Sequence, residues 1–359
     1  MQIGIITFHF ALSYGAVLQA YALSECIKSL GHDAFLVDYR PDYHVKRFQW
    51  NWTRCGLHLT NLTHPLLHKR FGEFSSKHLR LSSRSYKTLE ELTASPPEAD
   101  AYICGSDQIW NPVLTDMDPA YFLAFAPQGT RRIAYAGSFG KPELTTEELK
   151  HIRPYLQAIE HLSVREASAV RIVNDACGKQ AEHVLDPTLL IDKFDSVETH
   201  TPVKNRYVLV VDLQNNSLLR RTAGFVSRAL QLPKVIVTYS GRIWQLSGKR
   251  VFPGPSGYLG LFRNADYIVT NSFHGTAFSM VFNKPFIITP LSGNKSESNI
   301  RITGLLKSTD LSNCFLEMFS ESRIRKVMAS TIDIDWAPVR KRLHKLRQDS
   351  LRFLRESLS

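Results

Sequence analysis

One stretch of the chain, residues 267–285, constrains the fold more than any other. Its sequence is YIVTNSFHGTAFSMVFNKP. Residues 267–270 predict a buried strand, 271–275 a sharp turn, and the small and apolar residues Thr276 to Phe282 a helix. A helix that begins directly after a strand points backbone N–H groups out of its first turn, and such groups bind anions. Because His274 lies in the same turn, we interpret the stretch as the phosphate-handling centre of a transferase.

The composition fits a globular chain with two domains and a preference for anionic partners. Its 359 residues are enough for two domains of ordinary size. A formal net charge of +11 favours phosphorylated substrates, anionic lipid headgroups or nucleic acid. Nucleic acid is the least favoured of these and is not expected as a partner, because no recognition motif accompanies the charge.

Cysteine spacing and the N-terminal residues indicate the compartment. The five cysteines include no C-x-x-C pair, so the sequence predicts neither a zinc site nor a disulfide framework. The first ten residues, MQIGIITFHF, lack a basic n-region and indicate a strand rather than a signal peptide. No apolar run is long enough to span a bilayer. We therefore expect a reducing, cytoplasmic compartment.

The order of strand and helix patterns predicts an α/β fold with two Rossmann-like domains that face a cleft. The first domain covers residues 1–191 and opens with a strand–loop–helix–strand pattern, the start of a parallel sheet. A polar linker follows, and residues 206–335 repeat the α/β pattern. Residues 336–359 predict a separate basic helix.

Residues 41–95 differ from the rest of the first domain. Tryptophan, histidine and basic residues are mixed there, and hydrophobic periodicity is weak. We interpret the segment as a surface insertion with one or two helices. The alternative is a flap that binds the acceptor or faces a membrane, since basic and aromatic residues together suit a headgroup interface.

Polar residues gather where the predicted strands end, which is where parallel sheets bind ligands. Each has a structural alternative: residues 105–108 as an ordinary turn, Arg165 in a surface ion pair with Glu166, and His274 as a satisfied core histidine. Their shared position at strand ends favours a functional interpretation of the set. The candidates for the acceptor site or cleft are His9, Tyr14, Gly15, Gln19, Gly105, Ser106, Asp107, Gln108, Trp110, Asn111 and Asp186.

Six motifs together resemble the polysaccharide pyruvyl transferase family over roughly residues 1 to 310. They are SYGAVLQAYAL (13–23), GSDQIWNP (105–112), YAGSFG (135–140), SVRE (163–166), VLDPTLL (184–190) and VTNSFHGTAFSMVFNKPF (269–286). One departure is Ser13, where many relatives have Asn before the Tyr-Gly pair. The resemblance implies a GT-B-like architecture with the acceptor on the first domain and the donor on the second.

The resemblance also implies a reaction and a set of donor residues. Members of the family transfer pyruvate from phosphoenolpyruvate onto a sugar as a cyclic ketal, usually on lipid-linked or cell-surface glycans such as capsular polysaccharide. Arg165 and His274 match the family's donor-site Arg and His and are the catalytic candidates. The donor-binding candidates are Arg165, Ser272, His274, Gly275, Thr276 and Arg301.

The chemistry of this reaction suits those residue types. Phosphoenolpyruvate carries a phosphate and a carboxylate, so its site needs fixed cations and N–H donors, such as the planar fork of Arg165. Proton transfer to the enol carbon and from the sugar hydroxyls suits a group that titrates near neutrality, such as His274. No cofactor and no metal ion is expected.

Two other functions compete with this interpretation. A nucleotide-sugar glycosyltransferase of the GT-B type would have the same fold, but the helix from Gly275 to Lys284 contains no Asp or Glu to hold a ribose. A non-enzymatic glycan-binding module would not need an Arg and a His at strand ends of two domains.

The predicted C-terminal helix, residues 339–358, suggests a membrane partner. Apolar residues lie mostly along one side of it and basic residues fill the rest: Leu343, Leu346, Leu351, Phe353 and Leu354 are the apolar ones. We expect the apolar side to pack on the protein and the basic side to face anionic lipid, so that the protein is peripheral at the inner face of the cell membrane.

Overall fold

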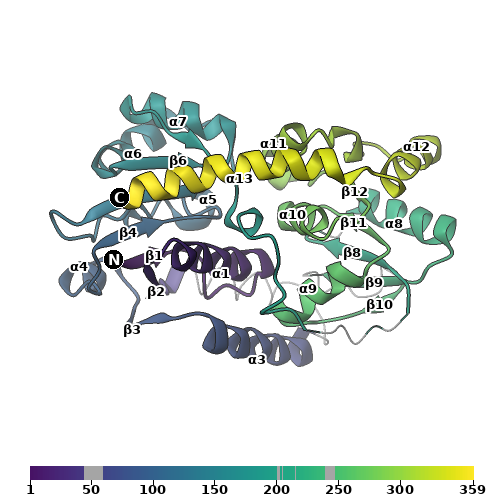
Figure 1. Ribbon diagram of the computed structural model, residues 1–359, viewed down its shortest axis with the longest axis horizontal. Coiled ribbons are helices and arrows are strands. Elements are labelled where there is room, and N and C mark those ends of the chain that lie inside the picture. The colour runs from purple at the N-terminus through teal and green to yellow at the C-terminus, as the bar shows by residue number, and fades with distance from the viewer. Residues whose placement is uncertain (44–59, 200–202, 204, 215, 239–246) are drawn as a thin grey trace. The chain divides into compact units, whose positions relative to one another are not determined.

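The computed structural model divides the chain into two compact α/β units (Figure 1). Unit 1 consists of Met1–Trp50, Ser75–Ile191 and His344–Ser359, and unit 2 of Asn51–Phe74 and Asp192–Leu343. The residues that the structure describes are 1–43, 60–199, 203, 205–214, 216–238 and 247–359.

Unit 1 is built on a seven-stranded sheet in the order β3-β2-β1-β4-β5-β6-β7. Every neighbouring pair is parallel. Strands β1 and β4 are neighbours in the middle of the sheet. From this pair, β2 and β3 extend the sheet on one side, and β5, β6 and β7 extend it on the other. The strands are β1 (Gln2–Ile6), β2 (Asp33–Tyr39), β3 (Leu81–Tyr86), β4 (Ala101–Cys104), β5 (Arg131–Gly137), β6 (His161–Val164) and β7 (Glu182–His183).

Helices connect these strands, as parallel pairing requires. A capping box begins α6, in which Thr145 Oγ1 accepts from the Glu148 backbone N–H and the Glu148 side chain accepts from the Thr145 N–H. Almost every residue of α1 is buried, in keeping with its sequence of small and apolar residues. The helical segments are α1 (Tyr14–Ser29), α4 (Leu89–Ala94), α5 (Pro112–Thr115), η1 (Pro119–Phe122), α6 (Thr146–Ala158), α7 (Ala167–Cys177) and η2 (Pro187–Leu189).

The segment expected to be an insertion, 41–95, contributes a strand to the sheet. Its helix α3 (Thr60–His78) is followed by β3, which pairs in parallel with β2. The hydrophobic pattern missed β3 because its sequence, LSSRSY, is polar and partly exposed, as an edge strand can be. The part of the insertion at 44–59 lies outside the described residues.

Unit 2 repeats the same plan with five parallel strands in the order β10-β9-β8-β11-β12. Here the order diverges at the β8/β11 pair, and both strands are buried throughout. The elements are β8 (Val208–Asp212), α8 (Ser217–Leu230), β9 (Lys234–Thr238), β10 (Lys249–Arg250), α9 (Pro255–Asn264), β11 (Tyr267–Thr270), α10 (Phe273–Val281), β12 (Phe286–Ile288), η4 (Gly293–Ser298), α11 (Asn299–Thr309), η5 (Ser312–Cys314) and α12 (Glu321–Ile332).

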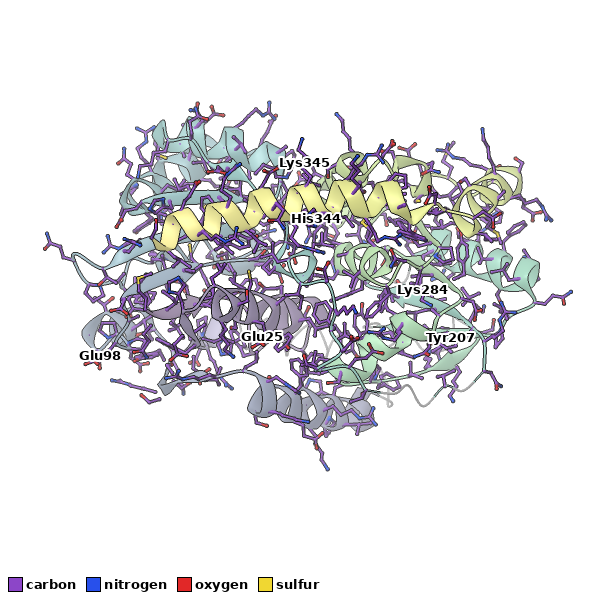
Figure 2. All side chains as sticks on the ribbon, in the orientation of Figure 1. Glu25, Glu98, Tyr207, Lys284, His344 and Lys345 are labelled. Carbon is purple, nitrogen blue, oxygen red and sulfur yellow. The ribbon has the colours of Figure 1, made fainter. Side chains whose placement is uncertain are left out.

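The C-terminal helix α13 (Trp336–Leu358) begins in unit 2 and ends in unit 1. Its apolar residues are buried in each: Val339 and Leu343 in unit 2, Phe353, Leu354 and Leu358 in unit 1. Basic side chains such as His344 and Lys345 are exposed (Figure 2). Within the described part of the chain, no helix combines the length and apolar character needed to cross a bilayer.

Helix α10 begins at Phe273, three residues earlier than the sequence predicts. Ser272 is its N-cap: the backbone of Ser272 is extended, and its Oγ accepts from the Gly275 N–H at 3.1 Å. Gly275 is therefore a helical residue and not part of the turn. A Cβ atom on Gly275 would lie 2.4 Å from Thr270 Oγ1 and 3.1 Å from Ser272 Cβ, so the helix start packs against β11 only with glycine there.

This packing predicts opposite effects for one substitution at two helical glycines. Gly275→Ala should destabilise unit 2 by about 1–3 kcal/mol, because the buried threonine has to move. Gly304→Ala in α11 should stabilise it by about 0.5–1 kcal/mol, because an alanine Cβ at that position meets no atom within 4 Å. Thermal unfolding monitored by circular dichroism compares the two variants. Equal melting temperatures would contradict the close approach at Gly275.

Candidate functional site

The two places where strand order diverges define the candidate site residues. In open parallel sheets, ligands bind outside the carboxyl ends of the strands at such points. In unit 1 these ends are residues 7–9 after β1 and 105–107 after β4. In unit 2 they are residues 212–214 after β8 and 271–274 after β11.

Gln19 joins the two strand ends of unit 1. Its Nε2 donates to Thr7 Oγ1 at 2.8 Å, and its Oε1 accepts from the Ser106 backbone N–H at 3.2 Å. Thr7 Oγ1 in turn donates to the Ser106 carbonyl at 3.0 Å. All three residues are buried. Gln19 and Ser106 thus hold the loops in place, and their side chains do not face solvent.

Arg165 lies inside unit 1 among three carboxylates, with 2% of its side chain exposed. Its nitrogens lie 2.7 Å from Asp186 Oδ2, 3.2 Å from Glu166 Oε1 and 3.6 Å from Asp107 Oδ1. Burial by itself would lower the pKa of Arg165, but the charges of Glu166, Asp186 and Asp107 hold it above its ordinary value. We call these four residues the Arg165 cluster.

Hydroxyl groups complete the Arg165 cluster. Asp186 Oδ1 accepts from the backbone N–H of Thr188 at 3.0 Å and from its Oγ1 at 2.7 Å. Ser138 Oγ donates to Glu166 Oε1 at 2.7 Å. A phosphate or carboxylate that approached Arg165 would compete with carboxylates already in place. These surroundings favour the ion-pair alternative for Arg165 over capture of a donor anion, and the pairing is buried rather than on the surface.

Asp107 is the member of the Arg165 cluster that reaches solvent. Its side chain is 12% exposed, against 3% for Glu166 and 0% for Asp186. The backbone of Asp107 has φ of 70°, a conformation uncommon outside glycine, and its Oδ1 accepts from the Gln108 N–H at 2.9 Å. Gly105 is required just before it, because its φ is 129° and a Cβ would lie 2.0 Å from the Tyr135 carbonyl oxygen.

The other acceptor candidates are parts of the core or of caps. Trp110 is fully buried, stacks on Phe122 and donates from Nε1 to the Tyr121 carbonyl at 3.0 Å. Asn111 caps α5 by accepting from the Val113 N–H at 2.9 Å. Gln108, half-buried, accepts from Asn111 Nδ2 at 2.7 Å. Tyr14 and Gly15 are buried in the first turn of α1.

His9 is held in a buried pair with Asp38. Its Nε2 lies 2.7 Å from Asp38 Oδ1, its Nδ1 lies 3.2 Å from the Thr7 carbonyl, and 2% of the residue is exposed. Burial raises the pKa of Asp38, but hydrogen bonds from His9 and Arg40 more than offset this and hold it below its usual range. Both ring nitrogens of His9 therefore already face protein oxygens.

In unit 2, Asp212 and Asn271 link the ends of β8 and β11. Asn271 Nδ2 donates to Asp212 Oδ1 at 3.3 Å, and its Oδ1 accepts from the Leu213 N–H at 2.8 Å. Both residues are fully buried. Neither was among the predicted site residues, although Asp212 is the last residue of an apolar central strand and Asn271 directly follows another. That pattern was the available signal.

His274 is the half-buried group at this strand end. Within residues 271–280 every residue except His274 is buried. The Thr276 hydroxyl is fully buried and donates to the Ser272 carbonyl at 3.0 Å, so it serves the helix. The Arg301 guanidinium lies 5.7 Å from the centroid of the Phe273 ring and donates to the Ser298 carbonyl at 3.3 Å. An imidazole, a guanidinium and the positive end of a helix thus gather at the start of α10, an arrangement that suits an anion.

We expect the protein to lose much of its unfolding free energy when the guanidinium of Arg165 is removed. Arg165→Met leaves the buried carboxylates of Glu166 and Asp186 without their guanidinium and should cost about 3–5 kcal/mol. Arg171→Met, at an exposed position of α7, is the matched control and should change little. Thermal unfolding measures both. A variant of Arg165 that melts like the wild type but binds phosphoenolpyruvate weakly would restore the anion-binding interpretation.

Solved structures with the same fold include three nucleotide-sugar epimerases. The UDP-GlcNAc 2-epimerase from Methanocaldococcus jannaschii is 11% identical with a TM-score of 0.51, covering 93% of this chain and 94% of that one. A putative UDP-N-acetylglucosamine 2-epimerase from Listeria monocytogenes is 10% identical with a TM-score of 0.54, covering 97% and 90%. The UDP-N-acetylglucosamine 2-epimerase from Rickettsia bellii is 12% identical with a TM-score of 0.51, covering 99% and 96%. At these identities the likeness shows the fold alone, which is of the GT-B type.

Sequence comparison identifies the family. A search of curated proteins gives no match. The family described as polysaccharide pyruvyl transferase matches residues 14–292. The matched region is well over half of the chain and contains Asp107, Arg165, Asp186 and His274. The chain therefore belongs to the polysaccharide pyruvyl transferase family.

Proposed function

We propose that the protein transfers pyruvate from phosphoenolpyruvate onto two hydroxyls of one sugar as a cyclic ketal. The acceptor sugar belongs to a lipid-linked or other glycan of capsular, exopolysaccharide or cell-surface biosynthesis. The observation that carries the proposal is His274, a half-buried imidazole at the positive start of α10 in a chain of this family.

Unit 2 has the residues that a donor with two anionic groups requires. The first-turn N–H groups of α10 and the guanidinium of Arg301 suit the phosphate and the carboxylate. Ser272 and Gly275 act indirectly, because the Ser272 hydroxyl caps the helix and Gly275 allows its close packing. We therefore assign the donor to unit 2 through His274 and Arg301, and leave Arg165 out of the donor site.

The reaction needs one proton delivered and two removed. The enol carbon of phosphoenolpyruvate gains a proton and becomes the methyl group. The two sugar hydroxyls lose their protons as their oxygens form bonds to the neighbouring carbon, and the C–O bond to phosphate breaks. One hydroxyl proton thus balances the proton added to carbon, and the other leaves with phosphate. We assign delivery of the proton to His274.

Asp107 is our candidate for the group that accepts a proton from the sugar. Sugar hydroxyls donate to carboxylates, and Asp107 is the member of the Arg165 cluster whose carboxylate reaches solvent. The fixed backbone of residues 105–107 and the nearby guanidinium hold that carboxylate in one orientation. Unit 1 would then supply the acceptor side of the reaction.

A nucleotide-sugar glycosyltransferase is the second candidate, because the GT-B fold serves both chemistries. Helix α10, with the sequence FHGTAFSMV, contains no acidic residue to hold a ribose, which favours phosphoenolpyruvate. Thermal shift with phosphoenolpyruvate or UDP-GlcNAc separates the two, since a ligand raises the melting temperature only if it binds the folded protein.

Mass spectrometry of glycans tests the reaction itself. Lipid-linked oligosaccharides incubated with the enzyme and phosphoenolpyruvate should gain the mass of pyruvate less water, and phosphate should be released in equal amount. Transfer of a hexose from UDP-sugar in the parallel reaction would replace the proposal with the glycosyltransferase.

Membrane association and a cytoplasmic location stay predictions. The exposed basic side chains of α13, among them Arg340, Lys341, Lys345 and Arg355, support attraction to an anionic surface.

His274 should be needed for chemistry more than for binding. His274→Gln keeps the size and some hydrogen bonding of the side chain but cannot transfer a proton. We expect phosphoenolpyruvate affinity within about tenfold of wild type and kcat lower by roughly 10²-fold or more. Calorimetry and phosphate release measure the two quantities, with His344→Gln on α13 as the control. Normal turnover of His274→Gln at saturating donor would leave His274 as a binding residue.

Substitution of Asp107 should slow the reaction with the sugar and leave donor binding unchanged. Asp107→Asn keeps the shape and the hydrogen bond from Gln108 but is a far weaker base, so kcat should fall by roughly 10²-fold while phosphoenolpyruvate affinity stays unchanged. Asp116→Asn, at another aspartate with positive φ, should have normal kinetics. Weaker donor binding in Asp107→Asn, with kcat intact, would remove Asp107 from the proposed role.

A further inference from the structure

We propose that His64 and His68 on α3 form a binding site for one divalent transition-metal ion such as Zn²⁺, Ni²⁺ or Cu²⁺. Their Nε2 atoms lie 3.2 Å apart, and the ring centroids are separated by 4.2 Å. Neither residue belongs to the proposed transferase site, so the proposal is independent of the reaction assigned above.

The two rings meet because they are four residues apart on one helix. Side chains at positions i and i+4 are neighbours on a helical surface. Three apolar side chains of the helix, Leu67, Phe71 and Phe74, are buried. The Arg70 guanidinium also donates to the Phe252 carbonyl. The histidines therefore sit on an anchored element rather than on a loop.

The distance between the two nitrogens matches a shared metal ion. Imidazole nitrogens bind zinc at about 2.0–2.1 Å, which places two ligands of a tetrahedral ion about 3.4 Å apart and two adjacent ligands of an octahedral ion about 3.0 Å apart. The observed 3.2 Å lies between these values. The ring centroids, 4.2 Å apart, have to move apart for both nitrogens to face one ion.

The hydrogen bond between the rings is compatible with metal binding. In that bond one neutral ring carries its hydrogen on Nε2 and donates it to the Nε2 lone pair of the other. Metal binding requires this hydrogen to lie on Nδ1 of the same ring, so that each Nε2 presents a lone pair while the number of bound protons stays the same. Imidazole ligands suit zinc, copper and nickel, whereas Mg²⁺ and Ca²⁺ prefer oxygen.

Two protein ligands leave the rest of the coordination sphere to water. Among the described residues, no group of three or more His, Cys, Asp or Glu side chains is placed to hold a metal ion. Pro65 follows His64 where a zinc-protease helix has glutamate, so we infer binding and no hydrolytic chemistry. The affinity expected of such an open site is micromolar.

Calorimetric titration of the full chain, without a histidine tag, tests the site. Titration with ZnCl₂ should show one Zn²⁺ bound per chain with a micromolar dissociation constant, and titration with MgCl₂ should show no such binding. His64→Gln and His68→Gln should each abolish that binding or weaken it at least tenfold, because one imidazole remains. His344→Gln removes an exposed histidine from α13 and should bind zinc as the wild type does.

A spacing variant gives the sharpest control. The double substitution His68→Lys with Lys69→His keeps composition and charge but places the second ring five residues from His64, on another side of the helix. We expect it to lose zinc binding while its circular dichroism stays that of the wild type. Equal zinc binding by this variant, or no binding by the wild type, would overturn the proposal.

Discussion

Parallel strands that are covered on both faces leave a protein few places for polar side chains, and the candidate sites of this chain follow from that constraint. Strands β8 and β11 are buried throughout, and the charged residue that they contain, Asp212, is the last residue of β8. At the carboxyl ends of the strands, backbone N–H groups and polar side chains can contact a ligand. Both sheets diverge at a central pair, and the residues that follow those strands include Asp107 in one unit and His274 in the other.

The Arg165 cluster explains why three separate motifs are needed in unit 1. Asp107 belongs to GSDQIWNP, Arg165 and Glu166 to SVRE, and Asp186 to VLDPTLL, and the three meet around one guanidinium. A buried charge is tolerated only when it is paired and hydrogen-bonded, so each motif depends on the others. The pairing also leaves one carboxylate, that of Asp107, at the surface of the cluster in a fixed orientation. The buried ion pairs and the proposed functional carboxylate of Asp107 thus belong to the same cluster.

The hydrophobic pattern predicted β11 with correct bounds, because a buried strand carries its own signal. It missed β3, a polar edge strand, and placed the start of α10 too late because Gly275 reads as a turn residue while its true role is close packing. The positions of the candidate residues at strand ends were also predictable. Their exposure was not: whether Gln19 or Trp110 faces a ligand or the core depends on partners far away in the chain, which no local pattern contains.

The charge at each strand end bears on which unit takes the donor. Phosphoenolpyruvate brings a phosphate and a carboxylate, and in the Arg165 cluster it would meet three carboxylates and one guanidinium already engaged with them. At the start of α10 it would meet Arg301, the imidazole of His274 and the positive end of the helix. A neutral sugar has the opposite requirement, since its hydroxyls need an acceptor of hydrogen bonds and protons, the role proposed for Asp107. The charges at the two strand ends therefore support the proposal that unit 2 takes the donor and unit 1 the acceptor.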